Sequence, residues 1–220
     1  MQSAAKVYDF VVIGAGSGGL ASARRAAQYG KKVCLMETAR LGGTCVNVGC
    51  VPKKVMFNAA NFLEDSLIMQ KGYGLFSGGS ARDYTTPLQI DWGILKESRD
   101  NYIKRLNGIY AGAIDTAGID LIKGTARFVD KKIIECGDQR VTAEHIVIAS
   151  GSKPSFPKGV KGIEHAKTSD DFFELESLPK RVLIVGSGYI GVELSGIFAA
   201  MGANVTLTGR GNRVLRAFDG

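Results

Sequence analysis

The chain has 220 residues, 45% of them hydrophobic, which is enough to form one or two cores and excludes a disordered chain or a small disulfide-stapled protein. Its formal net charge is +7, but the basic residues are scattered and do not alternate with aromatic residues, so we expect no nucleic-acid partner. We also expect no membrane partner, because no apolar run approaches the roughly 20 residues that span a bilayer.

The first predicted element is an apolar strand that begins at Asp9 and leads into a glycine-rich turn and a helix. The turn has the pattern Gly14-x-Gly16-x-x-Gly19, and the strand after the helix ends in Glu37. This strand–helix–strand arrangement is typical of dinucleotide-binding proteins. Because a carboxylate can accept hydrogen bonds from a ribose diol, Glu37 favours a dinucleotide without a 2′-phosphate, such as FAD.

Two cysteines follow in the segment Leu41-Gly-Gly-Thr-Cys45-Val-Asn-Val-Gly-Cys50-Val-Pro-Lys53-Lys54. In a regular helix, Cα atoms five positions apart would be about 8–9 Å from each other, which exceeds the limit of about 7 Å for a disulfide. If the two cysteines pair, the helix must therefore be interrupted between them. Gly49 permits an unusual backbone conformation, and Pro52 suits the first turn of a helix that begins near Cys50, where a thiolate is stabilised.

A redox-active pair, a metal site and two structural thiols are the possible interpretations of Cys45 and Cys50. Zinc would need further ligands, and His145 and His165 have no suitable spacing, so we expect no metal. The position beside the first dinucleotide motif favours the redox pair, since an FAD bound there could pass electrons to it.

The other two cysteines, Cys34 and Cys136, lie in apolar, strand-like runs and are expected to be buried thiols. The cysteines therefore do not form a secreted disulfide framework. We expect the cytoplasm as the compartment, with the mitochondrion as the alternative.

The middle of the chain contains a long helix and several short strands. The segment Lys71–Asp91 is glycine-rich and is expected to be an irregular surface excursion. An amphipathic helix is predicted from about Trp92 to Ala117, with apolar positions at Trp92, Leu95, Tyr102, Leu106, Ile109 and Ala113. Strands are predicted over residues 120–124, 126–129, 133–136 and 146–149, and the proline-containing segment Ser152–Lys180 is expected to connect two domains.

The pattern of the first unit repeats after Arg181, with the motif Gly186-x-Gly188-x-x-Gly191, a helix to Met201 and a strand over residues 204–208. In both units, 16 positions separate the first motif glycine from the helix-ending glycine, and 23 separate it from the residue that closes the second strand. The two copies predict two dinucleotide sites, because such glycines let the backbone approach a pyrophosphate at a helix N-terminus. Glycines that serve only close packing are the alternative.

The second unit has Gly209 at the place of the strand-end acid of the first unit. Loss of the carboxylate removes repulsion, and Arg210, Arg213 and Arg216 follow closely. Guanidinium groups can bind a phosphate through two parallel hydrogen bonds. The second dinucleotide is therefore predicted to be NADPH.

The cysteine segment Gly42-Gly-Thr-Cys-Val-Asn-Val-Gly-Cys-Val-Pro-Lys-Lys54 resembles the redox signature of the class I pyridine nucleotide-disulfide oxidoreductases. Within that family its form is most similar to the members that reduce glutathione disulfide. The resemblance covers all 220 residues and includes Tyr189-Ile-Gly-Val-Glu193 and the arginines from Arg210 to Arg216.

The resemblance implies NADPH-dependent reduction of glutathione disulfide, through FAD and a Cys45–Cys50 disulfide, in cell redox homeostasis. Cys50 would be the flavin-facing thiol and Cys45 the thiol that attacks the substrate. Lys53 would lie near the flavin and pair with Glu193 on the NADPH side. Tyr189 would be the lid that moves aside for the nicotinamide.

The resemblance also implies the remaining contacts. The cofactor-binding residues expected are Gly14, Gly16, Ser17, Gly18, Gly19, Glu37, Thr44, Cys45, Lys53, Ala126, Gly151, Gly186, Ser187, Gly188, Ile190, Gly191, Glu193, Arg210 and Arg216. The glutathione contacts expected are Ser17, Arg24 and Tyr110, of which Arg24 suits an anionic peptide. Without the resemblance, Arg24 reads as a surface charge and Tyr110 as a core aromatic residue.

The predicted fold is α/β with two Rossmann-like, three-layer domains: an FAD domain over residues 1–160 and the start of an NADPH domain over residues 161–220. Family members are about twice as long, so we expect the second domain to be truncated and the dimerisation domain, with its catalytic histidine, to be absent. The full-length protein is expected to be a homodimer. A thioredoxin-type disulfide reductase and a non-catalytic FAD-binding module are the alternatives, and Gly209 with Arg210 disfavours a dihydrolipoamide dehydrogenase.

Overall fold

The computed structural model describes residues 5–74, 88–216 and 218. The chain divides into two compact units, Met1–Val51 with Asn101–Lys161, and Pro52–Asp100 with Gly162–Gly220. The division after Lys161 lies one residue from the predicted domain boundary, whereas residues 52–100 are grouped with the second unit. The assignment of the units to FAD and NADPH stays a prediction.

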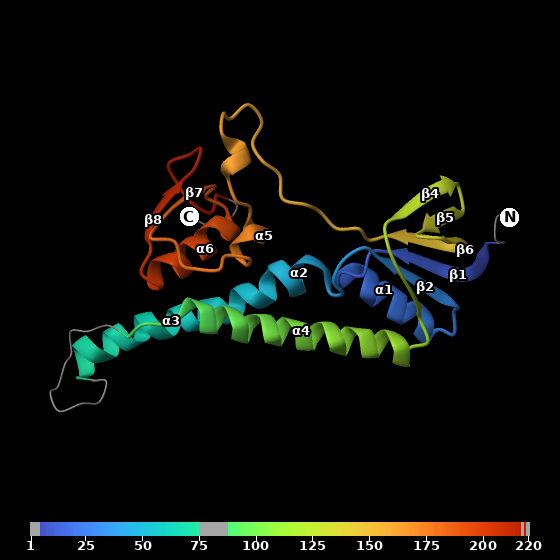
Figure 1. Cartoon of the computed structure of the whole chain (residues 1–220), viewed down its shortest axis with the longest axis horizontal. Helices are drawn as coiled ribbons and strands as arrows, with labels where there is room; N and C mark the ends of the chain where they lie inside the picture. Colours follow the sequence, from blue (N-terminus) through green and yellow to red (C-terminus); the bar gives the residue numbers. More distant parts are fainter. Residues whose placement is uncertain (1–4, 75–87, 217, 219–220) are drawn as a thin grey trace. The chain divides into compact units, whose positions relative to one another are not determined.

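A six-stranded sheet forms the first unit, in the order β3-β2-β1-β6-β5-β4 (Figure 1). Its parallel part consists of β1 (Lys6–Ile13), β2 (Val33–Glu37), β3 (Asp120–Lys123) and β6 (Gln139–Ile148). The strands β4 (Ala126–Asp130) and β5 (Ile133–Cys136) run antiparallel to their neighbours. With α1 (Ser17–Gln28) between β1 and β2, the parallel part has the Rossmann-like arrangement that the sequence predicts.

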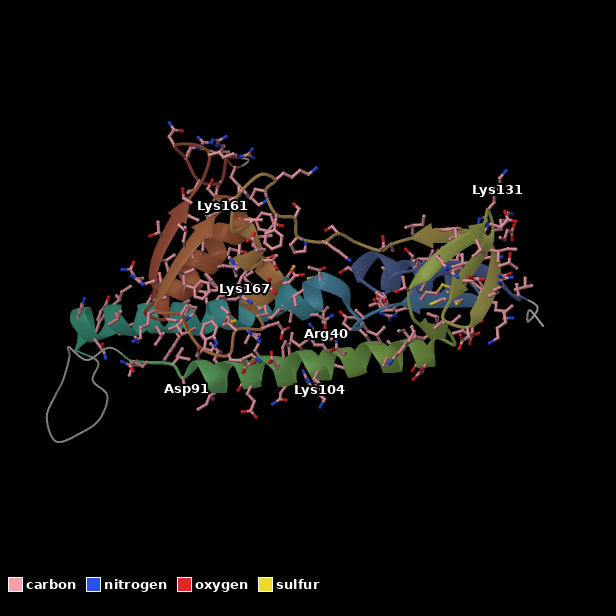
Figure 2. All side chains as sticks on the ribbon, turned by 45° about the horizontal axis from the view of Figure 1, so that its top comes forward. Arg40, Asp91, Lys104, Lys131, Lys161 and Lys167 are labelled. Carbon is pink, nitrogen blue, oxygen red and sulfur yellow. The ribbon has the colours of Figure 1, made fainter. Side chains whose placement is uncertain are left out.

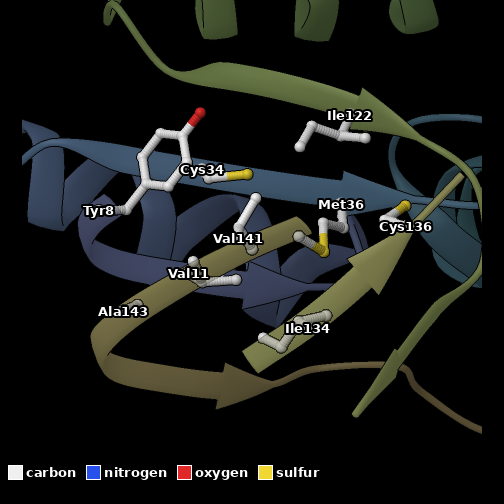
Figure 3. Close-up of a cluster of buried hydrophobic side chains, with 9 residues drawn as sticks. All are labelled: Tyr8, Val11, Cys34, Met36, Ile122, Ile134, Cys136, Val141 and Ala143. Carbon is white, nitrogen blue, oxygen red and sulfur yellow. The ribbon is translucent and has the colours of Figure 1, made fainter. Parts of the chain in front are cut away.

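Successive side chains of a strand point to opposite faces of the sheet. In the central strands both of these faces are buried. On one face, Val11, Cys34 and Met36 pack with apolar side chains of β3, β5 and β6 (Figure 3). On the other face, Val12 and Leu35 pack with residues of α1 and with the C-terminal part of α4 (Trp92–Thr116). The core of the first unit therefore lies on both sides of β1 and β2.

Cys34 and Cys136 are buried in this core, as predicted, with 0% and 1% of their surface exposed. Burial raises the pKa of the Cys34 thiol to about 12 and also raises the pKa of the Cys136 thiol. Both side chains therefore behave as small apolar groups at neutral pH.

The strand predicted over residues 146–149 is longer than expected, since β6 begins at Gln139. Its first residues pair with two strands at once, because Val141 lies beside both Lys6 of β1 and Ile134 of β5. Residues 139–145 are largely polar and carry a weak strand signal, so the sequence alone did not reveal this extension.

The second unit contains a parallel pair of strands, β7 (Arg181–Val185) and β8 (Asn204–Thr208), connected by α6 (Tyr189–Ala200). The predicted repeat of the strand–helix–strand pattern is thus confirmed. Leu194, Ile197 and Phe198 of α6 are buried. The opposite face of β7 is uncovered, with Leu183 and Val185 65% and 71% exposed.

An aromatic cluster joins α4 to α6 and to α5 (Ser169–Phe172) in the second unit. The ring of Trp92 stacks on Phe198 with centroids 6.2 Å apart, and Phe172 meets Phe198 edge to face at 4.9 Å. The indole N–H of Trp92 donates to the carbonyl of Leu175 at 2.9 Å. A short 3-10 helix, η1 (Ile163–His165), precedes α5.

The helix α4 has the predicted bounds to within one residue, but part of its predicted apolar face is wrong. Tyr102 and Ile109 are 40% and 54% exposed, whereas Arg99, Ile103 and Ile114 are buried. At residues 102 and 109 the buried stripe runs one position away from the predicted one, and it includes a charged residue, which a hydrophobic pattern does not reveal.

The helix α3 (Cys50–Tyr73) extends into the segment that was expected to be irregular from Lys71. Residues 75–87 of that segment lie outside the described residues. None of the described helices combines the length and the apolar character of a membrane span. Charged side chains extend outward from the backbone, as at Lys104 on α4 and Lys131 between β4 and β5 (Figure 2).

Candidate functional site

The three positions of the first motif differ in whether the structure requires glycine there. Gly14 has φ +104°, and a Cβ there would lie 2.8 Å from the carbonyl carbon of Ala149 at the end of β6. A Cβ at Gly19 would collide with the carbonyl oxygen of Gly14 and lie 2.9 Å from its carbon. At Gly16, in contrast, a Cβ would only reach ordinary contact with Gly43, at 3.7 Å. Packing therefore requires Gly14 and Gly19 but not Gly16.

The second motif repeats this division position by position. Gly186 has φ +135°, a Cβ at Gly191 would collide with the Gly186 oxygen, and nothing lies within 4 Å of a Cβ at Gly188. The amide of Gly14 donates to Met36 at 2.8 Å, and that of Gly186 donates to Thr208 at the same distance. A Cβ at Gly186 would also meet nothing within 4 Å, so that glycine is required by its φ alone. The middle glycines, Gly16 and Gly188, are the two that neither close packing nor a positive φ requires.

The same two middle glycines are the N-caps of α1 and α6, and neither helix has a side-chain cap or an acidic residue in its first turn. The first N–H groups of a helix lack intrahelical partners and attract negative charge. An open Cα beside such N–H groups is the form of cradle that a pyrophosphate needs. The residues of both loops therefore fit a dinucleotide, because close packing and positive φ together account for only two of the three glycines in each motif.

Glu37 is already engaged by the backbone of the first unit. Its Oε2 accepts a hydrogen bond from the amide of Ala15 at 2.6 Å, and its Oε1 accepts one from Ala39 at 2.8 Å. Each carboxylate oxygen retains a further lone pair, so the residue can still accept a ribose hydroxyl. Glu37 also holds the glycine-rich loop against the end of β2.

In the second unit, Ser187 takes up the space beside the corresponding strand end. A Cβ at Gly209 would lie 2.5 Å from Ser187 Oγ and 2.9 Å from Ser187 Cβ. The backbone just beyond is tied to the same residue, because the amide of Leu215 donates to the carbonyl of Ser187 at 2.8 Å. Leu215 has φ +53°, which is rare for a residue with a side chain.

The predicted phosphate-binding arginines lie on the segment between Gly209 and Leu215 and just after it. Arg210 and Arg216 are exposed. Arg216 packs its guanidinium on Gly211, where a Cβ would overlap it. Arg213 donates to the carbonyl of Phe218 at 3.2 Å. The segment therefore presents several guanidinium groups beside the open loop of the second motif.

The cysteine segment is built directly onto the first glycine-rich loop. Gly42, with φ +97°, donates its amide to the carbonyl of Ala15 at 2.9 Å. Gly43 has φ +63°, and a Cβ there would lie 2.6 Å from Gly16 Cα. The short helix α2 (Gly43–Val48), which carries Cys45, therefore starts in backbone contact with the loop that would hold a dinucleotide.

Two asparagines hold this helix in place, and neither was predicted as a site residue. Asn47 is buried and donates to the carbonyls of Leu41 and Gly43 at 3.0 and 2.9 Å. Asn107 on α4 donates to the Leu41 carbonyl at 2.8 Å and to Asn47 Oδ1 at 3.0 Å. Asn107 and Asn47 are 60 positions apart in the chain, so no local pattern could reveal their contact.

The helix is interrupted between the two cysteines, as the geometry of a disulfide requires. Helix α2 ends at Val48, Gly49 has φ −149° and ψ −124°, and α3 begins at Cys50. A Cβ at Gly49 would lie 2.8 Å from the carbonyl oxygen of Thr44. Glycine at 49 is therefore needed for close approach of the chain rather than for a positive φ.

Both cysteines are free thiols in the structure, Cys45 half-buried and Cys50 exposed. The pKa of Cys45 is raised above its ordinary value by burial and by the hydrogen bond and charge of the Cys50 side chain. The backbone N–H groups of Cys50 and Val51, the first of α3, donate to the Cys45 sulfur and act in the opposite direction. The N-terminal end of α3, predicted to act on Cys50, thus faces Cys45 as well.

Over residues 5–74, 88–216 and 218, no group of three or more His, Cys, Asp or Glu side chains could hold a metal ion. The hydrogen bond between the side chains of Cys45 and Cys50 places the two sulfur atoms beside each other. The arrangement suits thiol–disulfide exchange, which needs two neighbouring thiols and access for the attacked disulfide.

Within the second unit, Lys53 Nζ donates to Glu193 Oε1 at 2.6 Å. The side chains are 22% and 38% exposed, so the ion pair is partly shielded from water. Lys53 lies one turn after Cys50 on α3, and Glu193 lies in the second turn of α6. The ion pair that the resemblance implies is therefore present, and its catalytic role stays a prediction.

The other predicted cofactor contacts lie at strand ends and helix starts. Tyr189 and Ile190 open α6 and are 59% and 45% exposed. Thr44 is exposed on α2, and Gly151 follows the end of β6 with φ +71°. Ala126 opens β4 beside Cys136 of β5. Their contacts with a cofactor stay predictions.

The predicted substrate residues lie on two helices of the first unit. Ser17 and Arg24 are exposed and seven positions apart on α1, which places them on the same face two turns apart. Tyr110 on α4 is half-buried against the core beneath α1. The structure does not test whether the three residues bind one ligand.

Comparison with known proteins places the chain in a family. The model of the family described as pyridine nucleotide-disulphide oxidoreductase matches residues 8–220. The chain is 47% identical over 227 residues to a glutathione reductase of Schizosaccharomyces pombe, covering 100% of this chain and 47% of the relative. Glutathione reductases of Debaryomyces hansenii and Yarrowia lipolytica are 45% and 47% identical over 98% and 96% of this chain. The chain thus spans about half the length of these curated relatives, 48% and 46% in the latter two.

Proposed function

The chain belongs to the pyridine nucleotide-disulphide oxidoreductase family, and on that premise we propose that the protein reduces glutathione disulfide with NADPH, through FAD and the pair Cys45 and Cys50. One observation carries the proposal. The helix with Cys45 starts in backbone contact with the first glycine-rich loop, through Gly43 and Gly16. A redox pair is thereby built against the place where the first dinucleotide would bind.

The first unit fits FAD and the second fits NADPH. The open Gly16 and the first N–H groups of α1 would receive the FAD pyrophosphate, and Glu37 would receive the adenosine ribose. The open Gly188 and the start of α6 would do the same for NADPH, with Arg210 and Arg216 for its 2′-phosphate. When bound, FAD supplies the transfer of two electrons from NADPH to the disulfide.

The two cysteines would carry out the exchange with substrate. In the reduced protein, the Cys45 thiolate attacks glutathione disulfide, forms a mixed disulfide and releases one glutathione thiolate. The Cys50 thiolate then attacks the Cys45 sulfur, forms the Cys45–Cys50 disulfide and releases the second glutathione thiolate. Each leaving thiolate takes up a proton. Donation by Cys50 and Val51 N–H groups to the Cys45 sulfur supports its thiolate at the moment of attack.

We assign Lys53 and Glu193 to the control of charge beside the redox pair. Lys53 follows Cys50 by one turn of α3. The first backbone N–H groups of the same helix, at Cys50 and Val51, donate to the Cys45 sulfur. Pairing with Glu193 at 2.6 Å fixes the position of the Lys53 ammonium group. Tyr189, exposed at the start of α6, would cover the nicotinamide site until NADPH displaces it.

The choice of glutathione rests on α1 and on the relatives. Arg24 is an exposed cation two turns after Ser17 on the same helical face, which suits the carboxylates of an anionic peptide. The three relatives are named glutathione reductases. A thioredoxin-type reductase is the rival, since it would use the same cysteine pair.

The test compares two variants of the full-length, FAD-loaded protein after reduction and exposure to glutathione disulfide. Cys50→Ser is expected to accumulate a mixed disulfide of Cys45 with glutathione, because the thiol that resolves it has been removed. Cys45→Ser is the matched control and is expected to accumulate none. Mass spectrometry of the intact protein and of its peptides measures the adduct, and an adduct on Cys50 instead of Cys45 would reverse the assigned roles.

Substrate choice is tested separately by following NADPH oxidation with the wild-type protein. Glutathione disulfide is expected to sustain NADPH oxidation, and oxidised thioredoxin is not. The opposite result would keep the cysteine chemistry and discard glutathione. Absence of NADPH oxidation with any disulfide would instead favour a non-catalytic FAD-binding module.

A further inference from the structure

Two positions of the repeated units correspond in sequence but differ in structure. In the first unit, the residue after the first motif glycine is Ala15, and the residue that closes the second strand is Glu37, whose carboxylate accepts the Ala15 amide at 2.6 Å. The corresponding residues of the second unit are Ser187 and Gly209. Both positions of the first unit thus carry a Cβ, whereas the second unit has a hydroxyl on the loop residue and no side chain at the strand end.

The serine leaves no space for a side chain at the strand end. A Cβ at position 209 would lie 2.5 Å from Ser187 Oγ and 2.9 Å from Ser187 Cβ. Rotation of the hydroxyl would relieve the first contact but not the second, since the Cβ atom has no such freedom. Real Cβ atoms essentially never approach another heavy atom this closely, so a side chain at 209 requires movement of the loop or the strand.

Such movement is opposed by hydrogen bonds on both sides of the contact. The amide of Gly186 donates to Thr208 at 2.8 Å, which ties the loop to the strand just before position 209. The amide of Leu215 donates to the carbonyl of Ser187 at 2.8 Å, which ties the loop to the arginine-bearing segment. Separating positions 187 and 209 would strain both bonds.

We propose that Ser187 is a specificity-determining residue: with Gly209, it forms a coupled pair that keeps a ribose-binding acid out of the second site and so selects the dinucleotide with a 2′-phosphate. The inference rests on the proposed use of NADPH and deepens it. The arginines supply attraction for the phosphate, and Ser187 maintains the absence of the carboxylate that would repel it.

The pair also changes which donors are available. In the first unit the Ala15 amide is occupied by the Glu37 carboxylate. In the second unit, within the described part of the chain, no acceptor pairs with the Ser187 amide or hydroxyl. Both donors lie beside Gly209 and ahead of the arginine segment, where they can serve an anionic ligand rather than a strand-end acid.

The experiment is a binding cycle on the full-length, FAD-loaded protein, using calorimetric titration with NADP⁺ and with NAD⁺ so that no turnover occurs. The variants are Ser187→Gly, Gly209→Glu and the double variant, with Lys104→Ala, at an exposed position of α4, as a control on the first unit. Ser187→Gly removes both close contacts, whereas Ser187→Ala removes only the shorter one and serves as an intermediate step.

We expect Gly209→Glu alone to weaken NADP⁺ binding roughly a hundredfold, the size of a like-charge penalty of several kcal/mol, without gaining NAD⁺ binding. The double variant is expected to bind NAD⁺ more tightly than NADP⁺, because removal of the serine side chain lets the new acid reach the ribose. Ser187→Gly alone should retain the preference for NADP⁺. The NAD⁺ affinity of the protein with Ser187→Ala and Gly209→Glu should lie between that of Gly209→Glu alone and that of the double variant with Ser187→Gly.

The coupling would be overturned if the double variant's change in NAD⁺ affinity equalled the sum of the two single changes, or if Gly209→Glu alone bound NAD⁺ as tightly as the double variant does. That result would leave the proposed function standing as long as the wild type prefers NADP⁺. A wild-type preference for NAD⁺ would instead overturn the proposed use of NADPH, and the present inference with it. Because the readout is affinity, loss of catalysis in a variant does not affect the conclusion.

Discussion

Replacing two glycines of one motif should separate the packing role of the first loop from its binding role. Gly19→Ala would drive a Cβ into the carbonyl of Gly14, 2.9 Å from its carbon and 3.3 Å from Val12 Cγ1. Helix α1 would have to move away from β1, and overpacking of this kind costs about 1–3 kcal/mol or more. Gly16→Ala meets only Gly43 Cα, at 3.7 Å.

The expected cost of Gly16→Ala is small for identifiable reasons. Gly16 has φ −79° and ψ −169°, which any residue adopts. Alanine is a poorer N-cap than glycine by about 0.5–1 kcal/mol, but it lowers the entropy of the unfolded chain by about 0.4–1 kcal/mol. The two effects nearly cancel, so the unfolding free energy of the flavin-free protein should change by less than about 1 kcal/mol.

Binding of FAD should show the opposite order. A methyl group at Gly16 would stand where the pyrophosphate approaches the α1 amides, and each lost hydrogen bond to a charged group is worth about 1.5–3 kcal/mol, or roughly ten- to a hundredfold in affinity. The assays are urea unfolding of the flavin-free protein and titration with FAD, followed by quenching of flavin fluorescence. If Gly16→Ala destabilised the flavin-free protein as much as Gly19→Ala, or bound FAD like the wild type, the reasoning would be refuted.

Three further predictions follow from single contacts. Gly49→Ala places a Cβ 2.8 Å from the Thr44 oxygen, so it should lower the unfolding free energy by about 1–3 kcal/mol. It should also disfavour the Cys45–Cys50 disulfide in glutathione redox buffers. Gly72→Ala is the control and should do neither, because nothing lies within 4 Å of a Cβ there. Arg99→Met should lower the unfolding free energy, measured in urea, by about 2–4 kcal/mol. The reason is that the buried guanidinium donates to the Phe173 carbonyl at 2.6 Å and to Met56 Sδ at 3.2 Å. A change below about 0.5 kcal/mol, typical of surface sites, would contradict this prediction. In the reduced protein, the rate of Cys45 alkylation should reach half its maximum at a pH above about 8.5, the ordinary thiol pKa, because its pKa is raised and less thiolate is present at a given pH. A midpoint below that value, from rates measured by mass spectrometry, would refute the assignment.

The repeat is the part of the architecture that local sequence determines. Strand, glycine-rich turn and helix are short-range features, and each leaves a periodic or compositional signal within about 25 residues. The second strand–helix–strand unit of the structure therefore has the predicted elements, and β8 has the predicted bounds. The break between Cys45 and Cys50 was predictable for the same reason, since helix geometry and disulfide geometry conflict over five residues.

The structure shows that contacts between distant segments decide the rest. Arg99 is charged, yet it is buried by Met56 and Phe173, which lie 43 and 74 positions away. It belongs to the buried stripe of α4 with Ile103, whereas the predicted stripe included the exposed Tyr102 and Ile109. A hydrophobic pattern assigns charged residues to solvent, because it contains no information on the partners that make burial favourable.

The sequence by itself determined that this protein has two dinucleotide motifs of equal spacing and a cysteine pair next to the first, because each motif is carried by neighbouring residues. Only the tertiary structure decided what each motif residue does. It separated Gly16 and Gly188, where a Cβ would meet no close neighbour, from the motif glycines that close packing or a positive φ requires. It also revealed that Ser187 occupies the space at Gly209, since that contact depends on how a loop and a strand end, 22 positions apart, approach each other in the folded chain.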